Sequence, residues 1–349
     1  MFKRIIAIIL LAVTMISLTS CGKPEKKRYE AEFLELFDTV TQIVAYSESK
    51  EEFTKQSQMI YDALKEYHQL YNIYNDYPGI NNIKTINDNA GKKAVKVDRK
   101  IIDLLLFAKE WYQKTEGDLN VALGAVLKIW HNHREEANED EENATLPDIE
   151  ELREASKHTD INKVIIDEVN STVYLEDPKM SLDVGGVGKG YATEQVCLYA
   201  QKNGFTSGLI SVGGNVRALG SKGTKEEFWN VGVQNPDKES EQKTLGIVYI
   251  KDMSLVSSGI YERYYTVNGK RYHHLIDPNT LFPAENCSQV TILTKDSGVA
   301  DASAKAAFIM PFAQALEYIN ALPDVEAMWV FQDGSIKYSK GFEAYLNKK

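Results

Sequence analysis

The chain has 349 residues, of which 43% are apolar and 26% are charged, with 22 glycines and 9 prolines. This ordinary globular composition excludes collagen, coiled-coil and wholly disordered proteins, and it predicts a packed core. The 50 acidic residues against 40 basic ones give a net charge of -10, which argues against nucleic acid as a partner because nucleic-acid-binding surfaces cluster Lys and Arg.

The first 20 residues have the layout of a cleaved signal peptide. Lys3 and Arg4 precede an apolar run of 14 residues, which is shorter than the ~20 residues that a membrane-spanning helix needs. Residues 18–21, LTSC, resemble the bacterial lipobox, which implies that Cys21 carries the lipid, palmitate included, and becomes the mature N-terminus. The alternative is a plain secretory signal with an incidental cysteine. We expect a protein that acyl chains anchor to the cell membrane, on its extracytoplasmic face.

The mature chain is expected to hold one folded domain at 33–349, joined to the lipid by a charged tether at 21–32. Apolar residues at helical spacing predict amphipathic core helices at 53–71 and 99–114. The segment 131–146 is almost wholly polar and acidic, which predicts a surface loop or lid before a helical pattern resumes.

Strand patterns dominate the second half of the chain. They occur at 209–212, 229–233, 247–250, 290–293 and 328–331. The dipeptides Asn268-Gly269 and Asp333-Gly334 lie between strand patterns and are typical of type I′ hairpin turns, so part of the sheet should be antiparallel. Cys197 and Cys287 could form one disulfide, although we expect two small buried side chains.

The densest glycine cluster, DVGGVGKGYA at 183–192, is followed by a helical pattern that stops at Gly204. A glycine-rich loop that enters a helix lets backbone N–H groups approach an anion, and the helix N-terminus adds about half a positive charge. Phosphate is the natural ligand of such a loop; the alternative is a tight turn that only packs a helix on a strand. Asp183 and Tyr191 stand where the Walker and Rossmann fingerprints need glycine, which excludes both templates.

Three further segments follow in order: SVGGN at 211–215, RYHHLIDPNT at 271–280 and ADASAKA at 300–306. With the glycine cluster, they resemble the FAD:protein FMN transferases of the ApbE type, whose members show D-x-GG-x-x-KG-Y-A, GGN, H-x-IDP-x-TG and AD-A-x-x-T-A. Weaker matches lie at FDT (37–39) and at Gly124 with Trp130. The resemblance implies an α+β fold in which helices flank a mixed or antiparallel sheet.

The resemblance also implies a transferase that cleaves FAD, joins FMN through its phosphate to a Thr of a partner protein and releases AMP. The partner would be a membrane-associated or extracytoplasmic redox protein. Carried over by motif, His274 would be the general base, while Gly186 and Asp301, the latter also counted as catalytic, would hold a Mg²⁺ ion. The residues implied to contact FAD are Phe37, Tyr77, Ala122, Leu123, Gly124, Asp183, Lys189 and Leu275.

Adjacent or closely spaced histidines can also have purely structural roles. A His pair at the end of a strand places one ring on each face, so His273 or His274 is only packed or solvated. We favour His274 as the base and Asp277 as the group that orients it. His131 and His133 have a metal-like spacing but lie in the polar segment, which favours a solvated loop.

Three positions depart from the family pattern. Lys305 replaces the metal-binding Thr, one helical turn after Asp301. Two unit charges 4 Å apart interact by about 4 kcal/mol at an effective dielectric constant of 20, so an ammonium that close to a dication costs roughly twice that. Leu281 replaces a Gly and is strained if the position requires a positive φ, whereas Gly188 replaces an Ala and removes no donor.

The Lys leaves three outcomes open. Lys305 points away and waters replace the Thr, or its ammonium takes the place of the cation beside Asp301, or the protein binds FAD without transferring FMN. Asp301 could also be only the N-cap of a helix that runs to residue 309. We therefore predict a Mg²⁺-dependent transferase, with a catalytically impaired FAD-binding lipoprotein as the main alternative and a substrate-binding lipoprotein unrelated to flavin as a third.

Overall fold

The computed structural model describes residues 26–222 and 226–346. The expected signal peptide and the expected lipidation site, Cys21, lie outside these residues. Within the described part of the chain, no helix combines the length and the apolar character that crossing a membrane requires.

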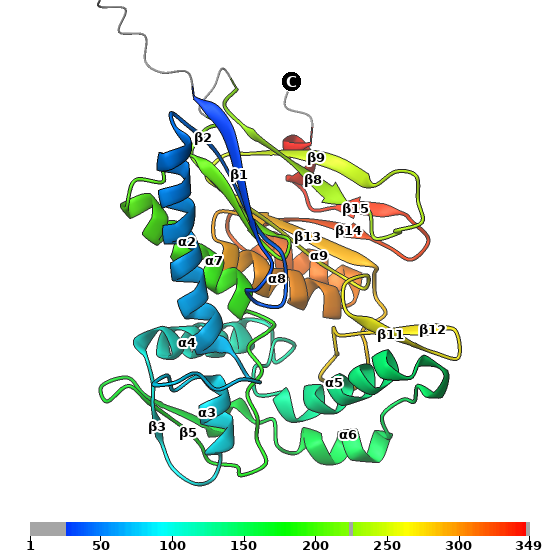
Figure 1. Cartoon of the computed structure of the whole chain (residues 1–349). Coiled ribbons are helices and arrows are strands. Elements are labelled where there is room, and N and C mark those ends of the chain that lie inside the picture. The colour runs from blue at the N-terminus through cyan, green and yellow to red at the C-terminus, as the bar shows by residue number, and fades with distance from the viewer. Residues whose placement is uncertain (1–25, 223–225, 347–349) are drawn as a thin grey trace, which may run out of the picture.

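An eight-stranded sheet forms the centre of the fold (Figure 1). In spatial order its strands are β1 (Lys27–Phe33), β2 (Thr41–Ser47), β6 (Gly208–Val212), β7 (Asn215–Leu219), β10 (Ser254–Gly259), β13 (Gln289–Thr294), β14 (Glu326–Val330) and β15 (Ile336–Tyr338). Every neighbouring pair is antiparallel. The expected α+β class is therefore confirmed, with an antiparallel sheet. Of the predicted strands, those at 209–212 and 290–293 lie within β6 and β13 of this sheet.

Three smaller sheets and the helices complete the fold. The sheets are β3 (Val95–Lys96) with β5 (Thr172–Leu175) and β4 (Val164–Asp167); β8 (Trp229–Gln234) with β9 (Thr244–Ile250); and β11 (Tyr264–Val267) with β12 (Lys270–His273). The helices are α2 (Lys50–Tyr71), α3 (Ile83–Asp88), α4 (Arg99–Lys114), α5 (Gly124–Glu139), α6 (Ile149–Ser156), α7 (Gly188–Lys202), α8 (Ser297–Ile309) and α9 (Phe312–Ala321). Short 3-10 helices occur at Glu141–Asn143, Ile161–Lys163 and Phe342–Tyr345.

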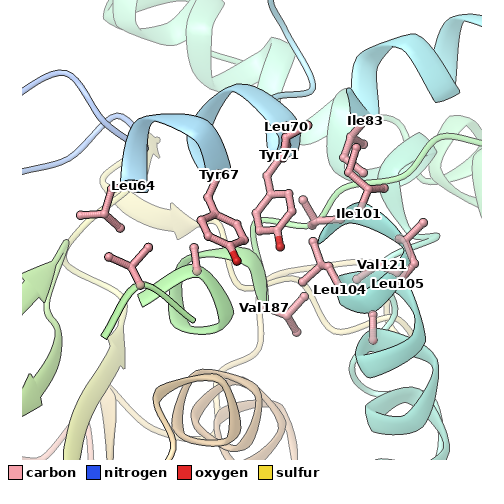
Figure 2. Close-up of a cluster of buried hydrophobic side chains, with 14 of the residues drawn as sticks. Leu64, Tyr67, Leu70, Tyr71, Ile83, Ile101, Leu104, Leu105, Val121 and Val187 are labelled. Carbon is pink, nitrogen blue, oxygen red and sulfur yellow. The ribbon is translucent and has the colours of Figure 1, made fainter. Parts of the chain in front are cut away.

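The helices bury apolar side chains that their 3.6-residue spacing places on one face. Figure 2 shows Leu64, Tyr67 and Tyr71 along one face of α2, with Tyr71 beside Ile101 and Leu104 of α4, and the three α2 side chains are buried. The Tyr71 hydroxyl donates to the Lys100 carbonyl at 3.2 Å, which gives its buried polar atom a partner. Both predicted helices, 53–71 and 99–114, are thus confirmed as core helices.

Helices α7 and α8, which contain the end of the glycine cluster and residues 300–306, pack against the central sheet. Helix α7 packs on β6 and β7, α8 packs on β10 and β13, and the two helices pack on each other (Figure 1). A buried carboxylate joins these elements: Glu194 of α7 accepts from the Ser297 N–H at the start of α8 at 2.9 Å and from Arg217 Nε of β7 at 3.0 Å. The start of α8 is therefore held in a defined position against the middle of α7 and strand β7.

The structure corrects the prediction of a tether at 21–32, because residues from 27 onward form strand β1. Residues 27–33 pair with β2 from Lys27 opposite Ser47 to Phe33 opposite Thr41. The charged residues of this strand are exposed, while Tyr29 stacks on Phe53 with ring centroids 5.5 Å apart. Charged side chains suit an edge strand because they discourage pairing with further chains.

The expected loop or lid at 131–146 is also corrected. Helix α5 continues to Glu139 and a 3-10 helix follows. Glu, Ala and Arg are good helix formers, and Trp130 and Ala137 give this polar segment a buried side. Residues 131–139 therefore belong to a helix with one exposed face, and only the end of the segment, 140–146, has the irregular or 3-10 structure of a connection.

The turns and the cysteines mostly agree with what the sequence predicts. Asn268 and Gly269 have φ of 51° and 79° and join β11 to β12, as a type I′ turn requires. At Asp333-Gly334 only Gly334 has a positive φ, so this hairpin has a longer loop, in which Gly334 N–H donates to the Phe331 carbonyl. Both described cysteines are buried and free.

Candidate functional site

A cavity of about 410 Å³ opens where the glycine cluster, the His pair and α8 meet. A smaller cavity of about 120 Å³ adjoins it, and Asp183, Lys189 and Arg263 line both. The larger volume falls in the range of small-molecule sites. Of the residues predicted from the sequence, the larger cavity is lined by Leu123, Asp183, Gly186, Lys189, His274, Leu275, Asp301 and Lys305.

The glycine cluster forms a turn that leads directly into α7. The Asp183 carboxylate accepts from the Gly185 N–H at 2.8 Å, and the Val184 carbonyl accepts from the Gly188 N–H at 2.7 Å. The N-cap residue of α7, Val187, makes no side-chain hydrogen bond, but the Asp301 carboxylate accepts from the Gly190 N–H in the first turn at 2.8 Å. The positive end of the helix dipole is therefore shared between Asp301 and any anion in the cavity. The loop entering a helix is thus confirmed, and Lys189 projects from its first turn into the cavity.

The surroundings of Lys189 in the cavity lower the pKa of its ammonium group. Desolvation within the cavity and the nearby Lys305 ammonium lower the pKa of Lys189 to about 8. Its charge is therefore costly without an anion, and an anionic ligand would relieve this cost.

Asp301 is held by contacts from both helices. One oxygen accepts from the Gly190 N–H at 2.8 Å, and the other forms an ion pair with the Lys305 ammonium. Asp296, not Asp301, is the N-cap of α8, because its side chain accepts from the Val299 N–H at 2.9 Å. The alternative role of Asp301 as an N-cap is therefore wrong.

A close crossing of α7 and α8 brings the glycine cluster to Asp301. A Cβ on Gly190 would lie 2.2 Å from the Asp301 Cβ, far inside van der Waals contact. A Cβ on Gly186 would lie 3.5 Å from Lys305 Cδ. Gly186 and Asp301, which the sequence predicts to share a site, thus lie on the same cavity wall.

The expected Mg²⁺ ion does not fit this site. Magnesium requires near-octahedral oxygen ligands and is usually held by one or two carboxylates. Here both Asp301 oxygens are already bonded, and Lys305 points toward the carboxylate rather than away. Across residues 26–222 and 226–346, no three His, Cys, Asp or Glu side chains are grouped as a metal site.

The two histidines separate as expected. The His273 ring is buried against Phe308, and its Nδ1 accepts from the Leu275 N–H at 3.2 Å. The His274 ring lines the cavity. Desolvation, together with Lys189 and Lys305, holds the pKa of His274 well below its usual value, so the ring is neutral near pH 7.

The orientation of His274 differs from the prediction. Its Nδ1 lies 3.3 Å from the Arg263 carbonyl oxygen, which can only accept, so this contact requires the proton on Nδ1 and leaves Nε2 as an acceptor. Asp277 instead accepts from the Asn279 N–H at 2.8 Å. A backbone carbonyl therefore replaces Asp277 as the orienting group.

The remaining predicted residues lie around the smaller cavity or behind the wall. Phe37 lines the smaller cavity, and its N–H donates to His68 Nδ1 at 3.0 Å. His68 Nε2 lies 3.1 Å from the Tyr77 hydroxyl, so Tyr77 supports this wall from behind. Ala122 and Gly124 are buried and line neither cavity. A Cβ on Gly124 would lie 2.3 Å from the Ser181 carbonyl oxygen, so this glycine serves close packing.

Several cavity residues are not apparent from sequence. Tyr74, Arg134 and Arg263 line the larger cavity, but they belong to no motif and no apolar period. His131, expected in a solvated loop, also lines the cavity, and its Nδ1 lies 2.6 Å from an Arg134 guanidinium nitrogen. Proximity to the motifs is the only sequence signal that these residues carry.

Leu281 adopts the positive φ that the family's glycine at this position suggested. Its φ is 65°, and its side chain is buried. The Trp130 indole N–H donates to the Leu281 carbonyl at 2.9 Å. Burial of the Leu side chain and this bond together offset the cost of a left-handed conformation, which is ~1–2 kcal/mol for a non-glycine residue.

Known proteins share both the sequence pattern and the fold. The model of the ApbE family matches residues 37–329. The FAD:protein FMN transferase of Treponema pallidum is 33% identical over 272 residues, which cover 74% of this chain and 73% of that protein. One from Klebsiella pneumoniae is 30% identical over 277 residues, covering 77% and 82%. The ApbE protein of Thermotoga maritima superimposes with a TM-score of 0.81 at 27% identity and covers 92% of this chain and 100% of that structure.

Proposed function

This chain belongs to the ApbE family, and we propose that it is an FAD:protein FMN transferase. The substrate is FAD, the acceptor is a Thr hydroxyl of a partner protein, and AMP is released. The observation that carries the proposal is the single cavity wall on which Lys189, His274 and Asp301 meet, although they come from three distant segments.

The cavity suits the diphosphate of FAD. The start of α7, where Asp301 occupies only the Gly190 N–H, offers partial positive charge, and the Lys189 ammonium offers a full charge beside it. Leu123 and Leu275 provide apolar wall for the rest of the molecule, and Phe37 does so in the adjoining cavity. Asp183 shapes the turn through its bond to Gly185. Tyr77 acts through His68 and is a positioning residue.

Transfer requires a base for the acceptor hydroxyl. The neutral His274 ring, with its proton on Nδ1, can accept the Thr proton at Nε2. The Thr oxygen then bonds to the phosphorus on the FMN side, and the bond from that phosphorus to the bridging oxygen breaks. AMP leaves with the bridging oxygen, and the proton held by His274 can pass to it.

Intact-mass spectrometry tests the transferase. The soluble domain is incubated with FAD and a panel of Thr-containing peptides, while released AMP is quantified. We expect a peptide that gains FMN with loss of AMP, and a rate about 10²–10⁴ lower in His274→Gln. His133→Gln is the matched control, because His133 is only half-buried and lies outside both cavities. FAD binding without AMP release or adduct would refute the transferase.

One observation favours the second candidate, an FAD-binding lipoprotein without transferase activity. The Lys305 ammonium is bonded to the carboxylate that the family pattern assigns to the metal. If transfer required a divalent cation at this carboxylate, the protein would bind FAD but would not transfer FMN. The mass assay separates the two candidates, because only the transferase releases AMP.

For the location, we propose a lipid anchor on Cys21 and an acceptor on the same extracytoplasmic face of the membrane. The lipobox resemblance at 18–21 supports this. Peptide mass mapping of the mature protein should find Cys21 at the N-terminus with its acyl groups. A mature N-terminus at another residue would overturn the anchor.

A further inference from the structure

We propose that the Lys305 ammonium is the resident cation of this site, and that FAD binding and FMN transfer proceed there without a divalent metal ion. The proposal deepens the transferase function and rests on it for the transfer step. The part concerning FAD binding can be tested separately.

The ion pair between Lys305 and Asp301 is built into the wall. The two residues lie one turn apart on α8, and their side chains are only 12% and 1% exposed. The second Asp301 oxygen is occupied by the Gly190 N–H from α7. A dication bound to the remaining lone pairs of Asp301 would lie beside the Lys305 ammonium, and the repulsion between the two cations would disfavour the metal ion.

The Lys side chain also fills the space that faces the glycine cluster. Lys305 Cδ lies 3.5 Å from the position of a Cβ on Gly186. An ammonium has three N–H donors, of which Asp301 takes one. The others remain for phosphate oxygens, which Lys commonly binds as a point charge.

Cationic side chains other than Lys305 also line the cavity and can face a diphosphate. Asp301 and Lys305 neutralise each other, while Lys189 and Arg263 line the cavity with no ion pair to the described residues. These two side chains are therefore free to contact the phosphate oxygens of FAD. Further charged side chains of both signs also line the cavity, namely Arg134, Asp38, Asp118, Asp183 and Glu262, whereas the neutral His274 adds no charge.

Metal binding and FAD binding together test the proposal. Mn²⁺ is titrated by electron paramagnetic resonance into the wild type and Lys305→Thr, and FAD affinity is measured in EDTA and in Mg²⁺. The wild type should bind no Mn²⁺ at this site and should hold FAD with less than a twofold difference between the two buffers. Lys305→Thr should gain one Mn²⁺ site and bind FAD at least tenfold more weakly in EDTA than in Mg²⁺.

Two control variants establish where the gained Mn²⁺ binds. Lys84→Thr breaks another Lys–Asp pair at helical spacing, between Lys84 and Asp88, which lies outside the cavity. It should gain no Mn²⁺ site. Adding Asp301→Asn to Lys305→Thr should abolish the gained site, which identifies its position on this acidic protein.

The outcomes distinguish the two proposals. Two results would overturn the resident ammonium even if Lys305→Thr fails to fold. One is stoichiometric Mn²⁺ binding by the wild type that is lost in Asp301→Asn. The other is FAD binding by the wild type that requires Mg²⁺. Adduct formation by the wild type in EDTA supports both proposals. No adduct in either buffer, with FAD bound equally in both, refutes the transferase but not the resident ammonium.

Discussion

Replacing Gly190 by Ala should separate α7 from α8. The added Cβ would lie 2.2 Å from the Asp301 Cβ and 2.4 Å from the Ser297 carbonyl oxygen. Because carbon atoms pack at about 3.5 Å or more, the helices would have to move apart by roughly 1.3 Å. Overpacking costs ~1–3 kcal/mol, and losing the N–H bond to a charged carboxylate costs ~1.5–3 kcal/mol. With ~1 kcal/mol of helix propensity in return, Gly190→Ala should lose about 2–5 kcal/mol.

Gly188→Ala is the matched control in the same helical turn. Its Cβ would lie 3.4 Å from the Tyr71 ring, which is ordinary contact, so Ala should stabilise α7 by up to ~1 kcal/mol. Urea unfolding measures both free energies, and FAD affinity should fall only in Gly190→Ala. Equal stability of the two variants would refute the argument that the helix crossing requires glycine.

Three further variants test other parts of the site. Leu281→Gly should be no less stable than Leu281→Ala in urea unfolding, because glycine relieves the positive φ, whereas at ordinary positions Ala is favoured by ~0.5–1 kcal/mol. FAD affinity should fall as pH rises above about 8, toward tenfold per unit, because Lys189 loses its charge there; Lys189→Gln should bind weakly at every pH, and a wild-type affinity that is flat to pH 9 would contradict this. Arg217→Leu should cost ~3–5 kcal/mol at pH 7 by leaving Glu194 buried and unpaired. That loss should shrink toward pH 5, because burial raises the pKa of Glu194 and protonation removes its charge.

The spacing of residues close together in the sequence predicted the helices well. Apolar periodicity predicted α4 with the observed bounds, and the glycine cluster predicted a turn into α7. The separation of Asp301 from Lys305 by four residues placed both on one helix face. These features depend on neighbours along one element, which a single sequence records directly.

Contacts between distant elements were harder to predict. The sequence alone left open whether Lys305 points toward Asp301. The crossing of α7 and α8 places the Gly190 N–H on one oxygen of the Asp301 carboxylate, and the Lys305 ammonium pairs with the other oxygen. Arg263 belongs to no periodic pattern and reaches the cavity because the segment before β11 passes its wall. Tertiary placement, not local preference, selects these residues.

Composition was misleading at two charged segments. The residues of β1 alternate between charged and apolar side chains, and this period of two predicts a strand better than their overall charge predicts a tether. In the segment after Trp130, acidic residues suggested a loop, although most of them are good helix formers. Local periodicity and propensity outweighed net charge in both cases.

The helix crossing that forms the site also ties its charges to the stability of the core. Glu194 holds the start of α8 against α7, and Gly190 holds Asp301 four residues further along α8. A shift between the helices would therefore move Lys189 relative to Lys305, and the charges that we propose to bind phosphate would lose their spacing before the domain unfolds. Weakened packing under α7 should thus reduce FAD affinity more steeply than it reduces helix content, because electrostatic complementarity depends on distances that a cooperative fold must maintain.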